Sequence, residues 1–137
     1  MQVSTISASI VTPNGTVYEG NVHMISVRAT GGDMGILPNH IPIVAPLKIS
    51  AVKLQKEDAP DEYVAVSGGF IEVRKGSVVT ILTEAAERKE DIDTERAQRA
   101  KEQAQQRLSE LNENTIEFKE AKQELERAEN RLHVASL

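Results

Sequence analysis

Residues that could carry out chemistry are few in this chain of 137 residues. The three histidines, His23, His40 and His133, lie far apart, and none has a second histidine or a carboxylate at metal-ligand spacing. Cysteine is absent, which excludes thiolate nucleophiles, disulfides, zinc ribbons and iron–sulfur clusters. The chain also lacks a glycine-rich phosphate loop and the nucleophile elbow of hydrolases. The sequence therefore predicts no catalytic residue and no metal site.

One pair of like charges stands out near the end of the chain. Arg127 and Arg131 are four residues apart, so on a helix they share a face and repel each other by a few tenths of a kcal/mol. Arg127 has Glu124 one turn earlier, but Arg131 has no carboxylate three or four residues before it. Two interpretations remain open. The face is simply solvated, which is the commoner case, or the two guanidinium groups hold an anion between them.

His40 lies in the segment Gly35–Pro42, which contains two prolines and belongs to an expected loop over residues 31–42. Proline restricts the backbone, so this segment is expected to be a rigid part of the surface. A general base needs partners that orient it, and the sequence places none beside His40. A structural or interface role is therefore favoured over catalysis.

Composition excludes several classes of partner. The chain has 16 basic and 21 acidic residues, a net charge of -5, which gives no basic footprint for nucleic acid or anionic lipid. Two Phe, two Tyr and no Trp provide no platform for stacking bases. No run of 18 apolar residues occurs, and the first residues lack the basic flank and apolar run of a signal peptide. We expect a soluble, unprocessed chain that does not bind nucleic acid.

A change in composition divides the chain in two. All eight glycines lie between Gly15 and Gly76, and all five prolines lie between Pro13 and Pro60. Residues 1–86 hold 14 charged side chains, whereas the shorter stretch 87–137 holds 23. Short strands separated by turns are expected in 1–86, and solvated helices in 87–137.

The first part, residues 1–86, reads as a sheet. Short runs rich in Val, Ile and Thr are separated by turn residues such as Pro13–Gly15 and Lys75–Gly76. Ile25 and Val27 alternate with polar neighbours, which is typical of a strand with one wet face. Ser67–Gly69 sits between two such runs and predicts a bulge or bend rather than a phosphate loop, because no helix follows to complete a phosphate site. Several strands without intervening helices predict a β-sandwich or flattened barrel.

Two apolar stripes at helical spacing mark the second part, residues 87–137. The stripes comprise Ala97, Ala100, Ala104, Leu108 and Leu111, and then Phe118, Ala121, Leu125, Ala128, Leu132 and Ala135. The polar stretch 112–115 separates them, with Asp91 expected to cap the first helix and Thr115 the second. Alanine buries little surface, so the two helices are expected to pack closely but weakly. A detachable arm and a permanently docked antiparallel hairpin both fit this pattern.

Several stretches resemble a known family when taken together. They are Val11–Pro13 with Tyr18–Gly20, Gly35–His40, Ala65–Phe70 with Glu72–Val73, and Ala85–Arg88. Over nearly its whole length the chain resembles the epsilon subunits of bacterial rotary (F-type) ATP synthases. The resemblance implies a β-sandwich N-terminal domain followed by a C-terminal antiparallel two-helix hairpin, in agreement with the division into 1–86 and 87–137.

The resemblance also implies a role and partners. Members of this family are non-catalytic subunits of the central stalk, which bind the gamma subunit and rest on the c-ring. In an extended state their helices reach the alpha and beta subunits and inhibit ATP hydrolysis. The chain would be peripheral to the cytoplasmic side of the bacterial plasma membrane, held there by the complex, with Asp33 and His40 as contacts to the c-ring.

Some family members bind ATP on the folded hairpin through Ile or Leu, Asp, two variable residues, Arg and Ala. Residues 92–97 of this chain match that pattern. The resemblance implies that Glu87, Ile92, Asp93, Arg96 and Ala97 line a nucleotide pocket, with Arg127 and Arg131 near the phosphates. ATP would be a regulatory ligand, and no cofactor is required. Residues 98–114 depart from the ATP-binding members, so no ligand is carried over there.

Simpler alternatives stand beside this one. Asp93 and Arg96 could form a plain helical ion pair worth about 0.3 kcal/mol, with no ligand. The chain could also be a free-standing nucleotide sensor or a coiled-coil adaptor. A rotary subunit should copurify with gamma, alpha and beta chains, whereas a free sensor should not.

Overall fold

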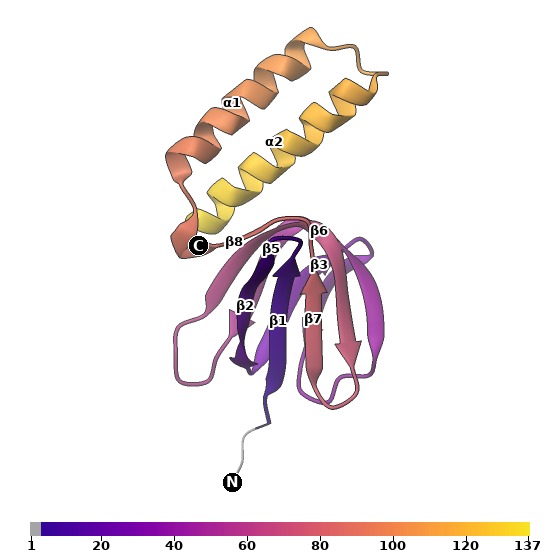
Figure 1. The fold of residues 1–137 in the computed structure, drawn as a ribbon, viewed down its shortest axis with the longest axis vertical. Helices are drawn as coiled ribbons and strands as arrows, with labels where there is room; N and C mark the ends of the chain where they lie inside the picture. The colour runs from indigo at the N-terminus through magenta and orange to yellow at the C-terminus, as the bar shows by residue number, and fades with distance from the viewer. Residues whose placement is uncertain (1–3) are drawn as a thin grey trace.

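The computed structural model describes residues 4–137 and places a sandwich of strands beneath a pair of helices (Figure 1). The strands are β1 (Ile6–Thr12), β2 (Gly15–Val22), β3 (Met24–Ala29), β4 (Gly32–Ile36), β5 (Ile43–Gln55), β6 (Glu62–Arg74), β7 (Val78–Leu82) and β8 (Ala86–Arg88). A 3-10 turn, η1 (Lys89–Asp91), leads into α1 (Thr94–Glu110) and α2 (Ile116–Ala135). The predicted fold class, a β-sandwich followed by an antiparallel two-helix hairpin, is confirmed.

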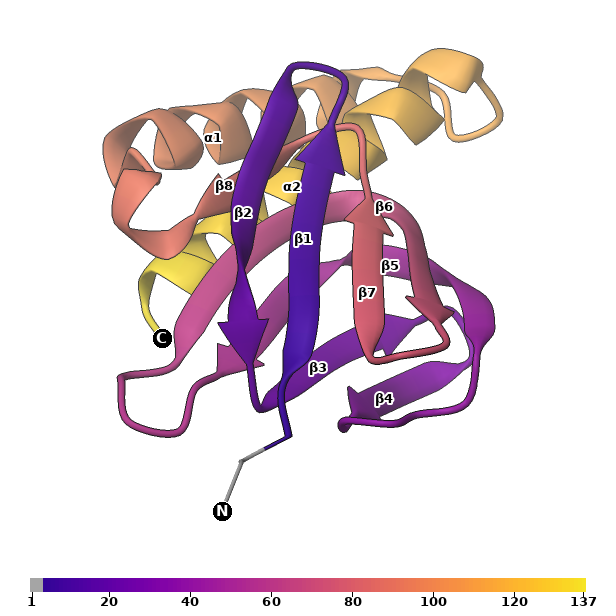
Figure 2. The same cartoon turned by 60° about the horizontal axis from the view of Figure 1, so that its bottom comes forward.

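The strands form one sheet in the order β2-β1-β7-β6-β5-β3-β4, with β8 added to β6. All pairs are antiparallel except β1 with β7. The sheet folds back on itself, so that β1, β2 and β7 face β3, β4 and β5 (Figure 2). The long strand β6 pairs with β8 through residues 64–66 and with β7 through residues 70–74. β6 therefore belongs to both layers of the sandwich.

The change of partner along β6 occurs at the paired glycines. Gly68 and Gly69 have φ angles of 80° and 97°, which residues other than glycine rarely adopt. A Cβ atom on Gly69 would lie 1.9 Å from the carbonyl oxygen of Leu82. The register between β5 and β6 does not shift at Ser67–Gly69, so of the predicted bulge or bend the structure shows a bend, which lets β6 turn the corner between the layers.

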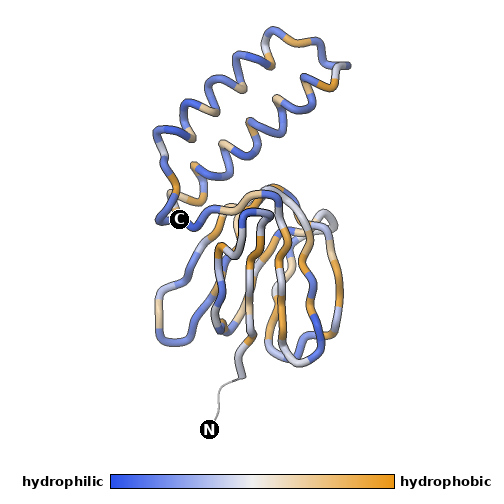
Figure 3. The backbone as a smooth tube through the Cα atoms, viewed as in Figure 1, coloured by the Kyte–Doolittle hydropathy of each residue, from blue (hydrophilic) through white to orange (hydrophobic). Residues whose placement is uncertain are grey.

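The core lies between the two layers and follows the period of two. In β1, Ile6, Ala8 and Ile10 are buried, and the serines between them are not. Ile25 and Val27 of β3 are buried as predicted from their alternation. Orange apolar positions alternate with blue polar ones along the strands, whereas blue dominates the helices (Figure 3).

The start of the first helix differs from the expectation. Asp93, not Asp91, is the N-cap of α1, and its carboxylate accepts a hydrogen bond from the backbone N–H of Arg96 at 3.0 Å. The prediction of Asp91 was wrong because residues 89–91 form η1 and Ile92 is extended, so the helix cannot begin earlier. The predicted cap of α2 is confirmed, since the Thr115 hydroxyl accepts from the N–H of Phe118 at 3.2 Å.

The seam between the helices is made of alanines. Ala97, Ala104, Ala121 and Ala128 are fully buried, whereas the leucines of both stripes are only half-buried. Arg107 of α1 and Glu124 of α2 add an ion pair at 2.8 Å. The hairpin is thus held by close contact of small side chains, as the two stripes predicted.

The hairpin rests on one end of the sandwich through α2. This helix packs on β5, β6 and η1, whereas α1 packs chiefly on α2 and stands farther from the strands (Figure 1). The last strand, β8, reaches Arg88, two residues past the boundary expected after residue 86. Within residues 4–137, neither helix has the length and apolar composition needed to cross a bilayer.

Candidate functional site

The residues of the predicted nucleotide pocket gather where the hairpin meets the sandwich. A hollow of about 180 Å³ is lined by Glu87, Asp91, Asp93, Arg96, Ala97 and Arg131. These residues come from β8, η1, the first turn of α1 and the end of α2. Antiparallel packing of the helices brings Arg131 back to the start of α1, although the two are more than 30 residues apart in sequence.

A second hollow continues along the seam. It has a volume of about 250 Å³ and is lined by Ala100, Gln103, Arg107, Glu124, Arg127 and Arg131. Arg131 belongs to both hollows, so they are neighbours. Each is smaller than the roughly 300 Å³ at which small-molecule pockets usually begin. A ligand of nucleotide size would therefore have to occupy both.

Of the two arginines that line the first hollow, Arg131 has a carboxylate partner and Arg96 has none in the described structure. Arg131 approaches Glu87 at 3.6 Å, and its Nε is buried without a hydrogen-bond partner. The Asp93 carboxylate caps the backbone of Arg96, and the two side chains form no ion pair within 4.0 Å in the described structure. The simple i,i+3 pair is thus absent, and the guanidinium of Arg96 is free to face a ligand.

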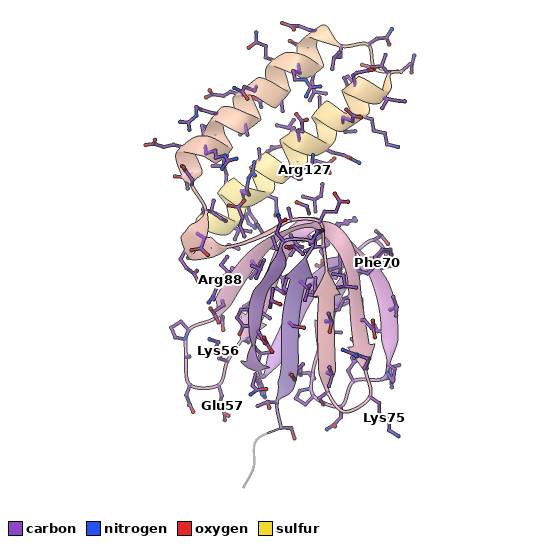
Figure 4. All side chains as sticks on the ribbon, in the orientation of Figure 1. Lys56, Glu57, Phe70, Lys75, Arg88 and Arg127 are labelled. Carbon is purple, nitrogen blue, oxygen red and sulfur yellow. The ribbon has the colours of Figure 1, made fainter. Side chains whose placement is uncertain are left out.

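Two of the predicted residues lie at the margin of this site. Ile92 is half-buried and donates its N–H to the carbonyl of Lys89 at 3.3 Å, but it lines neither hollow. Arg127 lines the second hollow and not the first, and it lies on α2 above the sandwich (Figure 4). Five of the seven predicted residues therefore meet in one hollow, and a sixth borders its neighbour.

A charged cluster beneath the hairpin was not foreseen. Arg88 of β8 forms ion pairs with Glu62 and Glu90, and its guanidinium lies 5.4 Å from the ring centre of Tyr18. Lys56 approaches Glu62 from the other side at 2.5 Å. No local spacing signals this cluster, because folding brings Arg88 beside Glu62, 26 positions away in the sequence, and beside Tyr18, about 70 positions away.

The cluster shifts the pKa of three of its members. Burial would lower the pKa of Arg88, but the hydrogen bond and the charge of Glu62 outweigh it and hold that pKa above its usual value. Burial, followed by the nearby negative charge of Glu62, raises the pKa of Tyr18 to about 12. Burial would also raise the pKa of Glu62, but the hydrogen bond from Lys56 and the charge of Arg88 outweigh it and hold that pKa below its usual value. The cluster is therefore a carboxylate kept ionised between two cations, which suits anchoring rather than proton transfer.

The predicted c-ring contacts lie on an edge of the sandwich. The expectation of a loop there was wrong for residues 32–36, which form the edge strand β4 paired with β3. Asp33 accepts a hydrogen bond from Arg28 at 2.9 Å, and both are exposed. His40 is half-buried in the following segment, between Leu37 and Ile41, which are 51% and 71% exposed.

A separate apolar surface covers the strand corner. Phe70 and Leu82 are cross-strand partners, and about half of each is exposed. Together with Val11, Pro13 and Gly69 they line a shallow hollow of about 390 Å³. Phe70 lies on the side of the sandwich (Figure 4). The strand pattern did not reveal this surface, because it combines the ends of β1 and β7 with the middle of β6. Residues 4–137 contain no cluster of three His, Asp or Glu side chains able to hold a metal ion.

Two family models cover the described chain. The beta-sandwich domain of the ATP synthase delta/epsilon chain matches residues 5–89, and the long alpha-helix domain of the same chain matches residues 90–136. The two matches meet one residue after β8, where the sandwich ends.

Relatives and solved structures agree with these matches. The ATP synthase epsilon chain of Halalkalibacterium halodurans is 55% identical over 131 residues, which cover 96% of this chain and 97% of that one. The epsilon chain of Bacillus velezensis is 53% identical, covering 97% and 98%. A chain in the Euglena gracilis mitochondrial ATP synthase, solved with F1 and the c-ring, is 25% identical with a TM-score of 0.82, covering 100% of this chain and 84% of that one. With two family models spanning residues 5–136 and relatives more than half identical over nearly the whole length, the chain belongs to the ATP synthase epsilon chain family.

Proposed function

We propose that this epsilon chain couples rotation in a proton-translocating ATP synthase and regulates ATP hydrolysis through its hairpin, with ATP as the signal. It is a non-catalytic subunit in this proposal and needs no cofactor. The observation that carries the regulatory part is the meeting of Arg96 from α1 with Arg131 from α2 at the base of the hairpin. A ligand bound there touches both helices at once.

The site suits a phosphate-bearing ligand. Arg96 and Arg131 supply guanidinium groups, which bind phosphate through paired hydrogen bonds, and Arg127 lies one turn farther along α2. The hollow opens at the N-terminus of α1, where the helix dipole favours negative charge. Glu87 would exchange its 3.6 Å contact with Arg131 for a place beside the nucleotide. We place the ribose or base near Ala97, the small residue at the wall of the hollow.

Binding at this place would hold the helices together. The alanine seam contributes little on its own, since burial stabilises by roughly 0.8 kcal/mol per methylene. A ligand at 100 times its dissociation constant adds about 2.7 kcal/mol to the packed form. High ATP would therefore keep the hairpin folded, and low ATP would release it to extend toward the alpha and beta subunits and inhibit hydrolysis.

The sandwich would provide the fixed contacts of the stalk. The exposed pair Phe70 and Leu82 is the surface that we assign to the gamma subunit, because a half-exposed apolar patch is costly in water unless a partner covers it. Asp33 and His40, with the exposed Leu37 and Ile41, are assigned to the c-ring. Through these contacts the chain would lie at the cytoplasmic side of the bacterial plasma membrane without entering it.

Calorimetric titration with ATP tests the regulatory site. The unmodified chain should bind ATP at millimolar concentration or below. Arg96→Ala and the double variant Arg127→Ala with Arg131→Ala should each weaken binding at least tenfold, because each removes charge-assisted hydrogen bonds worth about 1.5 to 3 kcal/mol apiece. Arg99→Ala, an exposed arginine on α1 outside both hollows, is the matched control and should bind like the unmodified chain. Absence of binding by the unmodified chain, or equal binding by all variants, would rule the site out.

A further inference from the structure

One side-chain amide joins α2 to the sandwich. The Nδ2 of Asn130 donates to the carbonyl oxygen of Ser50 at 2.8 Å and lies 3.5 Å from that of Val66. Ser50 and Val66 are cross-strand partners in β5 and β6. A single amide therefore bridges two neighbouring strands at the place where the helix rests on them.

The surface on either side of this amide is open. A hollow of about 450 Å³ lies toward β3, with Arg28, Lys53 and His133 on its walls, and one of about 150 Å³ lies toward β8. Asn130 lines both. The contact between α2 and the sheet is consequently narrow here, and the Asn130 amide lies between the two hollows.

Few other polar contacts support the docking. Within residues 4–137, no other side-chain hydrogen bond joins α2 to the strands, and the one ion pair between them, Arg131 with Glu87, is longer at 3.6 Å. Val134 lies one turn after Asn130 on the same face and is fully buried. We call Asn130 and Val134 the docking face of α2.

The docking face is distinct from the seam of the hairpin. Ala121 and Ala128 of α2 are buried on a different side of the helix, the side that packs on α1. Contacts of α1 are made chiefly with α2, so they do not depend on the sandwich. Loss of the docking contacts would thus free a hairpin that is still paired.

We propose that Asn130 is the residue that controls docking of the hairpin on the sandwich, and that undocking and separation of the helices are two distinct steps. The amide governs the first step, and the alanine seam governs the second. The regulatory meaning of this order rests on the proposed release of the hairpin. The role of Asn130 in docking does not rest on that proposed release, because docking involves neither a nucleotide nor a partner subunit.

Thiol labelling of a buried cysteine tests the role directly. The chain has no cysteine, so Val134→Cys gives a single thiol that reacts only when the docking face opens. In this background Asn130→Ala removes the donor, and Asn130→Asp directs a carboxylate at two carbonyl oxygens. Without any nucleotide, we expect the labelling rate to rise about fivefold in Asn130→Ala and about tenfold or more in Asn130→Asp. The effect of Asp is larger because its carboxylate and the two carbonyl oxygens are all acceptors, so they repel each other and no hydrogen bond forms.

Matched controls separate docking from general weakening. Gln123→Ala and Gln123→Glu make the same chemical changes at an exposed position of α2 and should leave the labelling rate unchanged. A second reporter, Ala104→Cys in the seam, should label at the same rate with or without Asn130. Far-ultraviolet circular dichroism should show full helix content in every variant.

Two results would overturn the proposal. Labelling of Val134→Cys at the control rate in both Asn130 variants would mean that the amide does not hold the helix. Equal acceleration at Ala104→Cys would mean that the amide stabilises the hairpin as a whole. Neither result bears on ATP binding, which the calorimetric titration tests separately.

Discussion

At the scale of single residues, the cluster of Arg88, Glu62, Lys56 and Tyr18 anchors the strand that leads into the hairpin. Arg88 is the last residue of β8, and it is tied to the sandwich by an ion pair and by the ring of Tyr18. Movement of the hairpin would therefore begin after Arg88, in residues 89–93, and Glu87, which we propose lies beside the nucleotide, would stay with the sandwich.

Glu62→Gln tests the energetic weight of this cluster. The pKa of Glu62 is lowered by folding, so its ionisation stabilises the fold above its unfolded pKa of about 4.3, and that contribution is lost as pH falls through the lower folded pKa. We expect the variant to be less stable by about 1 to 3 kcal/mol at pH 7, with the difference shrinking below pH 4. Urea unfolding across pH measures both.

The neighbouring Glu57→Gln provides the control, since Glu57 is exposed nearby and forms no ion pair in the described structure (Figure 4). It should unfold like the unmodified chain at every pH. The pKa of Tyr18, about 12, should also fall in Glu62→Gln, because the Glu62 charge is one of its causes. A loss of stability that does not depend on pH, with the pKa of Tyr18 unchanged, would contradict the idea that the ionised Glu62 carboxylate stabilises the fold.

At the scale of secondary-structure elements, periodicity predicted most of what the structure contains. The alternation of Ile25 and Val27, the bend at Gly68 and the alanine stripes depend on local spacing, and all were predicted correctly. β4 was missed because Gly32–Ile36 is short and rich in glycine, and only its pairing with β3 makes it a strand.

The candidate sites show the same limit. The hollow at Arg96 and Arg131 was anticipated through family resemblance, whereas spacing alone suggested only an arginine pair. Asn130 carried no signal at all, because an asparagine on a charged helix resembles any solvated residue. Its importance depends on two carbonyl groups that are 64 and 80 residues away in sequence.

The extent of β8 predicts where the sandwich can be cut. A fragment ending at Arg88 keeps β8 and the ion pair with Glu62, whereas one ending at Ala85 loses both and leaves Glu62 beside Lys56 alone. We expect the longer fragment to fold, with a cooperative melt and a β-type circular dichroism spectrum. The shorter one should melt at lower temperature. Equal melting temperatures would show that β8 adds nothing to the sandwich, and an unfolded longer fragment would show that the sandwich needs the helices.

At the scale of the whole molecule, the two parts differ in how they meet partners. The sandwich has a deep apolar core and an exposed apolar surface at Phe70 and Leu82, so it suits a lasting contact. The hairpin has a thin seam and a narrow docking face, so it suits a contact that changes. This division agrees with the proposed function, in which the sandwich turns with the rotor and the hairpin responds to ATP.

Copurification measures the lasting contact and also separates a rotary subunit from a free sensor or adaptor. A tagged chain should recover gamma, alpha and beta subunits from detergent-solubilised bacterial membranes.

Phe70→Glu with Leu82→Glu should reduce that recovery at least tenfold, because two charges would be buried against an apolar partner surface. The control is Ile116→Glu, which changes a still more exposed apolar residue on the hairpin and should leave recovery unchanged. All three side chains are already about half exposed or more, so neither variant should unfold, and a melt of each purified variant verifies this. Recovery that survives the double substitution would place the gamma contact elsewhere on the sandwich, and failure of the unmodified chain to recover any partner would favour the free sensor.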